Sequence, residues 1–164
     1  MSASTDDVAG GSGGTPEERL EAMGLSVPEV AKPVASYIPA VRSGSHVFTS
    51  GQLPMRDGHL ITTGKVGGEV TEEEAVECAR QCALNALAAV RAEIGELSRV
   101  KRVVKVVAFI ASTPDFTGQP GIANGASELF GEVFGDAGRH ARSAVGVPVL
   151  PLDSPVEVEI VVEV

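Results

Sequence analysis

The stretch HARSAVGVPVLPLDSPVEVEIVVEV, residues 140–164, contains two runs of β-forming residues in which side-chain character alternates. Alternation sends neighbouring side chains to opposite faces of a sheet. The last run places apolar side chains at every second position and glutamates between most of them: Val156, Val158, Ile160, Val162 and Val164 against Glu157, Glu159 and Glu163. In the run before it, Arg142 shares a face with Ala144, Gly146 and Pro148. An arginine and carboxylates on such apolar strands suggest a role beyond packing.

Capping signals upstream of these strands predict the helices. Thr15 and Glu18 form a Thr-x-x-Glu capping box, which begins a short helix that ends near Gly24. Thr71 and Glu74 form a second box, which begins the longest helix, to about residue 96. A further helix is expected over residues 122–134, where apolar side chains recur at helical spacing.

The remaining apolar segments are typical of strands. Two strands are expected within residues 36–53, joined around Ser43-Gly44, and a third short one over 59–62, after the Asp57-Gly58 turn. The valine-rich segment 100–112 is expected to be a central strand. The order βββ-α-β-α-ββ predicts an α+β fold with both long helices on one face of the sheet. The face that carries Glu157 would then meet water or another subunit.

Composition limits the class of protein. The chain has 164 residues, a net charge of −9 and 43% hydrophobic residues, which suits one globular domain. We divide it into a flexible tail (1–14), an N-terminal helix and linker (15–32) and a main domain (33–164). The acidic balance argues against nucleic acid as a partner. No apolar run approaches a membrane span of about 20 residues, and the start lacks a signal-peptide pattern, so a cytoplasmic protein is expected.

Cysteine and histidine give no clear motif. Cys78 and Cys82 lie four residues apart on one helix face, and without other clustered ligands we interpret them as two buried thiols rather than half of a metal site. The three histidines are scattered and are interpreted as surface or turn residues, although His140 stands two positions before Arg142.

Arg142 and Glu157 could share a site only under certain topologies. A tight hairpin near residues 152–153 would set Arg142 opposite about residue 163, roughly 20 Å of strand away from Glu157. The connection must therefore cross another strand, or the site must span two subunits.

The motifs FTSGQLP (48–54), HARSAVGV (140–147) and LPLDSPVEVEIVVEV (150–164) together resemble the RidA/YjgF family, over residues 33–164. The resemblance implies a chorismate mutase-like fold in which the last two strands are not sheet neighbours. It also implies a homotrimer with three clefts between subunits.

The resemblance also implies site residues. The catalytic arginine of the family's ARS motif is Arg142 here, and the first glutamate of its last strand is Glu157. Other site positions match substrate-binding residues Tyr37, Ser50, Gly51 and Asn124. Where the family often has a cysteine after ARS, this chain has Ala144, which keeps a backbone N–H but no thiol.

The implied activity is hydrolytic deamination of reactive 2-imino acids to 2-oxo acids and ammonia, with no metal or cofactor. Arg142 would grip the substrate carboxylate, and Glu157 would orient or deprotonate the attacking water. Two alternatives stay open: a non-enzymatic trimeric module that binds small carboxylates, and an endoribonuclease. The net charge of −9 and the lack of a histidine pair count against the endoribonuclease.

Overall fold

The computed structural model describes residues 13–30, 32–33 and 36–164, so most of the expected tail lies outside the described residues. The first element, α1 (Pro16–Ala22), begins at the predicted capping box, with Thr15 and Glu18 each bonding the other's backbone. Leu20 of this helix is fully buried and belongs to the same core as the sheet. The short N-terminal helix therefore packs as part of the main body.

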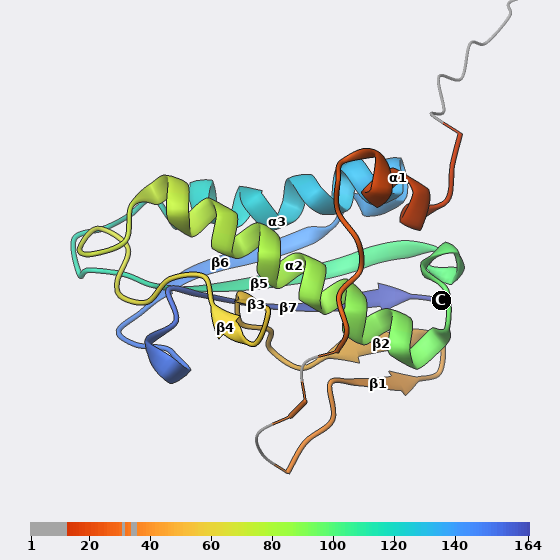
Figure 1. The fold of residues 1–164 in the computed structure, drawn as a ribbon, viewed down its shortest axis with the longest axis horizontal. Helices are drawn as coiled ribbons and strands as arrows, with labels where there is room; N and C mark the ends of the chain where they lie inside the picture. The colour runs from red at the N-terminus through yellow and green to blue at the C-terminus, as the bar shows by residue number, and fades with distance from the viewer. Residues whose placement is uncertain (1–12, 31, 34–35) are drawn as a thin grey trace, which may run out of the picture.

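Five strands form the main sheet (Figure 1), in the order β1-β2-β7-β5-β6. Their bounds are β1 (Ala40–Ser43), β2 (His46–Thr49), β5 (Arg102–Ala111), β6 (Ala141–Val147) and β7 (Val156–Glu163). The pair β5 and β6 is parallel, and the other neighbours are antiparallel. The two closing strands are thus separated by β5. The valine-rich strand is interior, as β5, but the middle position belongs to β7.

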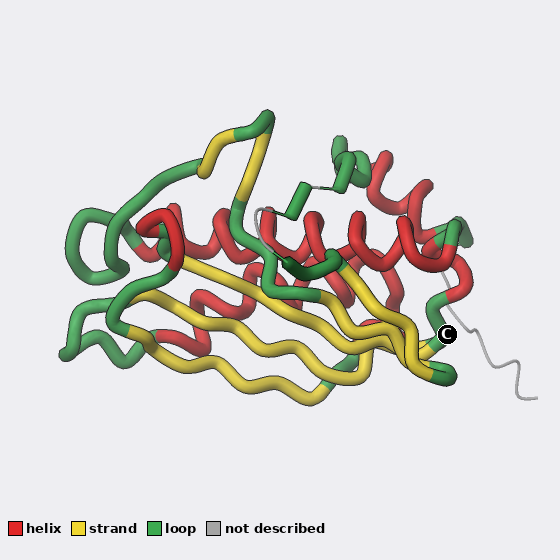
Figure 2. Tube along the Cα trace, turned by 90° about the horizontal axis from the view of Figure 1, so that it is seen from below, coloured by secondary structure: helices red, strands yellow, loops and turns green. Residues whose placement is uncertain are grey.

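Two long helices, α2 (Glu72–Ile94) and α3 (Gln119–Phe134), cover one face of this sheet, as predicted (Figures 1 and 2). The Thr71–Glu74 capping box begins α2, and Gly95 ends it with a φ of 93°. The helices cross closely at Gly125, where an added Cβ would overlap the carbonyl of Val76. Valine, alanine, leucine and isoleucine side chains of both layers make up most of the core.

The third predicted strand does not join the main sheet. It is β4 (His59–Leu60), which pairs with β3 (Met55–Arg56) in a separate two-stranded hairpin. Asp57 and Gly58 turn this hairpin with φ angles of 53° and 81°, and two positive φ angles give a turn that matches the right-handed twist of the paired strands. Arg56 bonds Glu77 and Gln81 of α2, and these contacts explain why the hairpin lies against the helix instead of the sheet edge.

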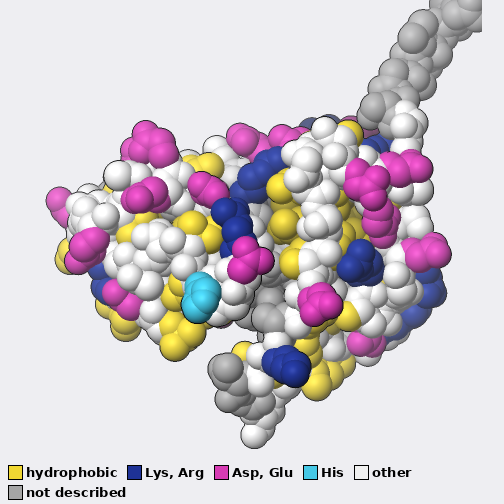
Figure 3. All heavy atoms as spheres, in the orientation of Figure 1, with side chains coloured by type: hydrophobic (Ala, Val, Ile, Leu, Met, Phe, Trp, Pro, Cys, Tyr) yellow, Lys and Arg dark blue, Asp and Glu magenta, His cyan; other side chains and the backbone are white. Residues whose placement is uncertain are grey.

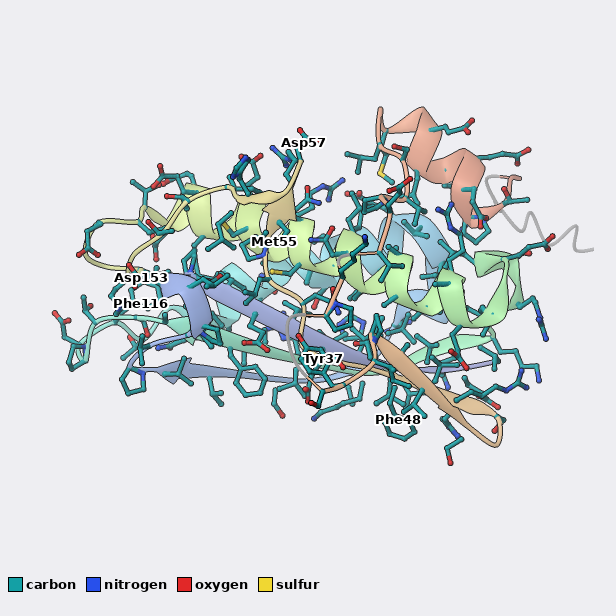
Figure 4. All side chains as sticks on the ribbon, turned by 60° about the horizontal axis from the view of Figure 1, so that its bottom comes forward. Tyr37, Phe48, Met55, Asp57, Phe116 and Asp153 are labelled. Atoms are coloured by element: carbon teal, nitrogen blue, oxygen red, sulfur yellow. The ribbon has the colours of Figure 1, made fainter. Side chains whose placement is uncertain are left out.

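The other face of the sheet carries no helix among the described residues (Figure 2). Its strands present apolar side chains to solvent: Val41, Phe48 and Val145 are 44–49% exposed. Phe48 projects from β2 on this side, away from the helices (Figure 4). We name this surface the open face. An apolar surface of this kind is typical of an interface with another chain.

The two cysteines are structural, as interpreted. Both are fully buried in α2, and burial raises the pKa of Cys78 to about 12 and that of Cys82 well above its ordinary value. Within the described part of the chain, no three His, Cys, Asp or Glu side chains gather closely enough to hold a metal ion. None of the helices described is both long and apolar enough to cross a membrane.

Candidate functional site

Glu157 lies on β7 and points to the open face, opposite Phe109 of β5. Its side chain is half-buried, and its pKa is raised above the ordinary value, first by burial and second by the negative charge of Glu159. Burial disfavours a charged carboxylate, and a like charge two positions along the same strand face adds to that effect. A carboxyl group with a raised pKa exchanges protons more readily near neutral pH.

Gly51 packs directly against the Glu157 carboxylate. A Cβ built on this glycine would overlap Oε1 of Glu157, so any larger residue must displace the carboxylate. The close approach is fixed by Gln52, whose backbone exchanges two hydrogen bonds with Val158 of β7, at 2.8 and 3.0 Å. The glycine of the FTSGQLP motif is therefore required to leave room for Glu157.

Ser50 holds the segment that precedes β1. Its hydroxyl donates to the carbonyl of Ile38 (2.6 Å), and its backbone N–H donates to the carbonyl of Pro39 (2.8 Å). That N–H is therefore already used within the chain. Ser50 positions Tyr37, which is 48% exposed at the rim of a pocket that reaches Gly51. Figure 4 shows Tyr37 on this segment, beside the sheet.

The pocket beside Gly51 has a volume of about 120 Å³. It is smaller than the roughly 300 Å³ of a complete small-molecule site, so it holds part of a ligand. In Figure 3 the surface is hollowed between the β3–β4 hairpin and the segment before β1. Its described lining is mainly apolar: Pro33, Tyr37, Pro39, Leu53, Met55 and Leu152, with Lys32, Gly51 and Gln52. We name Glu157, Gly51, Ser50, Tyr37 and this pocket the carboxylate half-site.

Leu152 enters this pocket from a strained connection. Leu152 and Asp153 both have φ angles of 58°, which non-glycine residues rarely adopt. Asp153 is held by Lys65, with Nζ 2.6 Å from Oδ1, and by the N–H of Gly64, which donates to the Asp153 carbonyl. Leu152 is nonetheless 67% exposed. Backbone strain of this kind concentrates at functional sites.

Arg142 lies on β6, the edge strand, and its guanidinium contacts α3 in three places. Nη1 donates to Oδ1 of Asn124 (2.8 Å) and to Oγ of Ser127 (3.1 Å), and Nη2 donates to the carbonyl of Pro120 (3.3 Å). The structure thus brings together Arg142 and Asn124, which are 18 residues apart. Ala144 follows on the same strand face and packs against the core with its methyl group.

Two N–H donors of Arg142, Nε–H and the second hydrogen of Nη2, bond no other described residue. A guanidinium carries five N–H donors, and the three bonds above use both hydrogens of Nη1 and one of Nη2. Nε–H and Nη2 lie side by side along one edge of the planar group, which we name the open edge. Such an edge suits bidentate binding of a carboxylate.

Ser127 was missed by the sequence reasoning, and His140 was noted only because it stands two positions before Arg142. Ser127 Oγ lies 2.8 Å from Nε2 of His140, whose Nδ1 lies 2.6 Å from the carbonyl of Gly138. The spacing offered a signal, because Asn124 and Ser127 are three residues apart on one helix face. His140, directly before β6, is likewise two residues from Arg142 in the sequence. We name Arg142, Asn124, Ser127 and Ala144 the arginine half-site.

The two half-sites lie on opposite faces of the sheet within one chain. Arg142 pairs with Val106, which is buried beneath the helices, whereas Glu157 pairs with Phe109, three residues further along β5. An odd spacing along a strand changes the face. One chain therefore does not place Arg142 and Glu157 in a common cleft.

Comparison with known proteins agrees with this fold. The model of a family described as "YjgF/chorismate mutase-like, putative endoribonuclease" matches residues 17–164. The chain belongs to this family. The YjgF-like assignment also fits a solved structure from Shewanella oneidensis, named a putative endoribonuclease, with a TM-score of 0.90, 38% identity, and coverage of 92% of this chain and 100% of that one.

Two curated proteins extend the YjgF-like comparison. Protein TCP17 of Trypanosoma cruzi is 44% identical over 145 residues, or 88% of this chain and 91% of its own length. A 2-iminobutanoate/2-iminopropanoate deaminase of Dermatophagoides farinae is 34% identical over 138 residues, or 84% of this chain and 93% of its own length. The resemblance to the RidA/YjgF family and the expected α+β fold are thereby confirmed.

Proposed function

We propose that this protein hydrolyses 2-imino acids to 2-oxo acids and ammonia without a metal or cofactor. We further propose that it acts as a homotrimer, in which the arginine half-site of one copy faces the carboxylate half-site of the next. The observation that carries the proposal is the open edge of Arg142, which suits a carboxylate. The opposite-face placement of Arg142 and Glu157 and the uncovered open face support an inter-subunit site. The relative named as an imine deaminase supports the reaction class.

Substrate binding begins at Arg142. Nε–H and Nη2–H hold the two carboxylate oxygens, and the guanidinium stays in place because Asn124, Ser127 and Pro120 bind its other donors. The planar two-point grip fixes the orientation of the adjacent C=N bond. Orientation of two reactants is a large part of the rate gain in such an addition.

Hydrolysis then needs one group that moves protons. Glu157 takes a proton from water as the water oxygen bonds to the imine carbon, and it gives that proton to the imine nitrogen to form a carbinolamine. Glu157 then takes the proton of the new hydroxyl group as its oxygen forms the C=O bond, and it delivers this proton to the amine nitrogen as the C–N bond breaks and ammonia leaves. One imine and one water give one 2-oxo acid and one ammonia, with no change in oxidation state.

Imines generated in the assay by an amino acid oxidase test this proposal. Added protein should accelerate the release of ammonia. It should also reduce the amount of semicarbazone that forms from the free imine. If 2-oxo acids bind but the imine decays at its uncatalysed rate, the alternative of a carboxylate-binding module is correct. Cleavage of RNA without imine hydrolysis would favour the endoribonuclease; against it, Figure 3 shows acidic side chains spread over the visible surface.

The pocket lining predicts the substrate side chain. Because Leu53, Met55 and Leu152 line the pocket beside Gly51, imines of leucine or methionine should be hydrolysed with a higher kcat/KM than the imine of glutamate. Leu152→Asn should lower kcat/KM for the leucine imine by about 10-fold, since burying a few methylenes discriminates by that order. It should leave 2-iminopropanoate nearly unchanged.

Asparagine is the chosen replacement because it tolerates the positive φ of position 152. The melting temperature should therefore not fall. Equal losses for the large and the small imine would show that Leu152 does not contact the substrate side chain.

Glu159→Gln should shift the pH dependence of kcat/KM without lowering the maximal rate of imine hydrolysis. The charge of Glu159 is the second cause of the raised Glu157 pKa, so its removal lowers that pKa toward the ordinary range. As a base, Glu157 must be ionised, so kcat/KM falls as the pH drops through its pKa. The acid limb of the Glu159→Gln profile should therefore lie at lower pH than that of the wild type. A limb at unchanged pH would mean that Glu157 is not the titrating group.

A further inference from the structure

His140 and Ser127 form a chain of hydrogen bonds that ends on Arg142. The carbonyl of Gly138 can only accept, so Nδ1 of His140 (2.6 Å away) carries the proton, and in the neutral ring Nε2 is an acceptor. The Ser127 hydroxyl therefore donates to Nε2 across 2.8 Å, and its oxygen accepts from Nη1 of Arg142 across 3.1 Å. All three bonds run in one direction, from the guanidinium to the Gly138 carbonyl.

The outer end of this chain is anchored rigidly. An added Cβ at Gly138 would overlap the carbonyl of Phe130 in α3, so the glycine backbone sits directly against that helix. Phe130 is fully buried and meets the His140 ring edge-on, with the ring centroids 5.9 Å apart. The imidazole is therefore held by a carbonyl on one side and an aromatic ring on another.

Without His140, the Ser127 hydroxyl would donate its hydrogen bond in a different direction. A serine on a helix can turn its hydroxyl to the carbonyl one turn earlier on its own helix. An acceptor at Nε2 draws the hydroxyl proton toward β6 and leaves the oxygen lone pairs directed at Arg142. A donor and its acceptors aligned in this way also strengthen one another.

We propose that His140, acting through Ser127, is a positioning residue that fixes the Arg142 guanidinium so that its open edge faces the substrate carboxylate. This inference rests on the proposed function for its role in catalysis, but the positioning itself is a property of the folded chain. His140 does not touch the substrate, and it takes no proton from it.

Three variants test the proposal: His140→Leu, Ser127→Ala and the double variant. Leucine can still pack against Phe130, and alanine favours the helix, so each should fold with a melting temperature close to that of the wild type. Each single variant should lower kcat/KM for imine hydrolysis by roughly 10- to 100-fold, the cost of a misplaced binding group. It should also weaken pyruvate binding, measured by calorimetry. His59→Gln, a change in the exposed hairpin, is the matched control and should alter neither.

The double variant decides whether His140 works through Ser127. If it does, removing both should cost little more than removing Ser127 alone, because one hydrogen-bond chain is lost once. His140→Gln should recover part of the loss, since its amide oxygen can accept from Ser127. Losses that multiply in the double variant, or pyruvate affinity within about two-fold of wild type in His140→Leu, would overturn the proposal.

One readout does not depend on the enzyme activity. Nitrogen–proton NMR of the arginine side chains should show slow rotation of the Arg142 guanidinium in the wild type and faster rotation in His140→Leu. If the wild type proves inactive on imines but this difference appears, the proposed function fails and the positioning role stands. Equal rotation in both proteins would overturn the positioning role itself.

Discussion

Glu157→Gln should lower the rate of imine hydrolysis by roughly 10²- to 10⁴-fold, the usual value of general acid–base catalysis. Glutamine has nearly the same size, so Gly51 still packs against it and the strand is unchanged. Arg142 still binds the carboxylate, and the affinity for pyruvate should remain close to that of the wild type. The loss should therefore appear in kcat rather than in KM. Steady-state rates with imines made in situ, and calorimetry with pyruvate, measure the two quantities.

Protein stability provides the control for this variant. Folding raises the pKa of Glu157, so the native state binds its proton more tightly than the unfolded state does. The stability contributed by this group is present at low pH and is lost as the pH rises through the raised pKa. Glu157→Gln should then melt at or above the wild-type temperature near neutral pH, with an advantage that shrinks in acid. If Glu157→Gln hydrolysed imines at close to the wild-type rate, Glu157 would not be the proton-transfer group.

Arg142→Lys should be nearly as inactive as Arg142→Ala, with kcat/KM lower than that of the wild type by at least about 10²-fold. Lysine keeps the positive charge but has no planar fork. One ammonium cannot replace the bonds to Asn124, Ser127 and Pro120 and also grip both carboxylate oxygens. Both kcat/KM and the affinity for pyruvate should fall.

Arg102→Lys is the matched control, because it makes the same charge-preserving substitution at an exposed residue. Arg102 lies at the start of β5. It should hydrolyse imines at the wild-type rate. Retention of most of the activity by Arg142→Lys would make Arg142 a general electrostatic anchor, and another group would have to orient the substrate.

Local sequence signals predicted most of the fold because they act over few residues. The capping boxes at Thr15 and Thr71, and the alternation in β7, specified those elements and their faces. Pairing between distant strands was harder to predict, because no local sequence signal places β5 between β6 and β7. The β3–β4 hairpin left the main sheet because Arg56 bonds α2, a contact between segments 21 residues apart in sequence.

The residues of the candidate site likewise divide into those that the sequence predicted and those that only the structure shows. Arg142 and Glu157 stood out by their residue type on apolar strands, and the family resemblance supplied Asn124 and Gly51. The opposite-face placement of Arg142 and Glu157 follows from the register of both strands on β5, which the sequence does not reveal. The contact of Ser127 with His140 depends on how α3 lies over β6, so it emerged from the packing alone.

In the proposed trimer, each site combines Glu157 of one copy with Arg142 of another. Subunit mixing tests it directly: Glu157→Gln and Arg142→Ala chains are co-expressed in equal amounts and purified together, without separation of the mixed from the unmixed assemblies. Each variant alone should be almost inactive. In a trimer assembled at random from equal amounts, about a quarter of the sites join an intact Glu157 to an intact Arg142.

Imine hydrolysis by the unfractionated co-expressed mixture should therefore recover to about a quarter of the wild-type rate per chain. If both residues acted within one chain, every site would keep one defect. Activity of the mixture that stays at the level of the single variants would contradict a site shared between subunits.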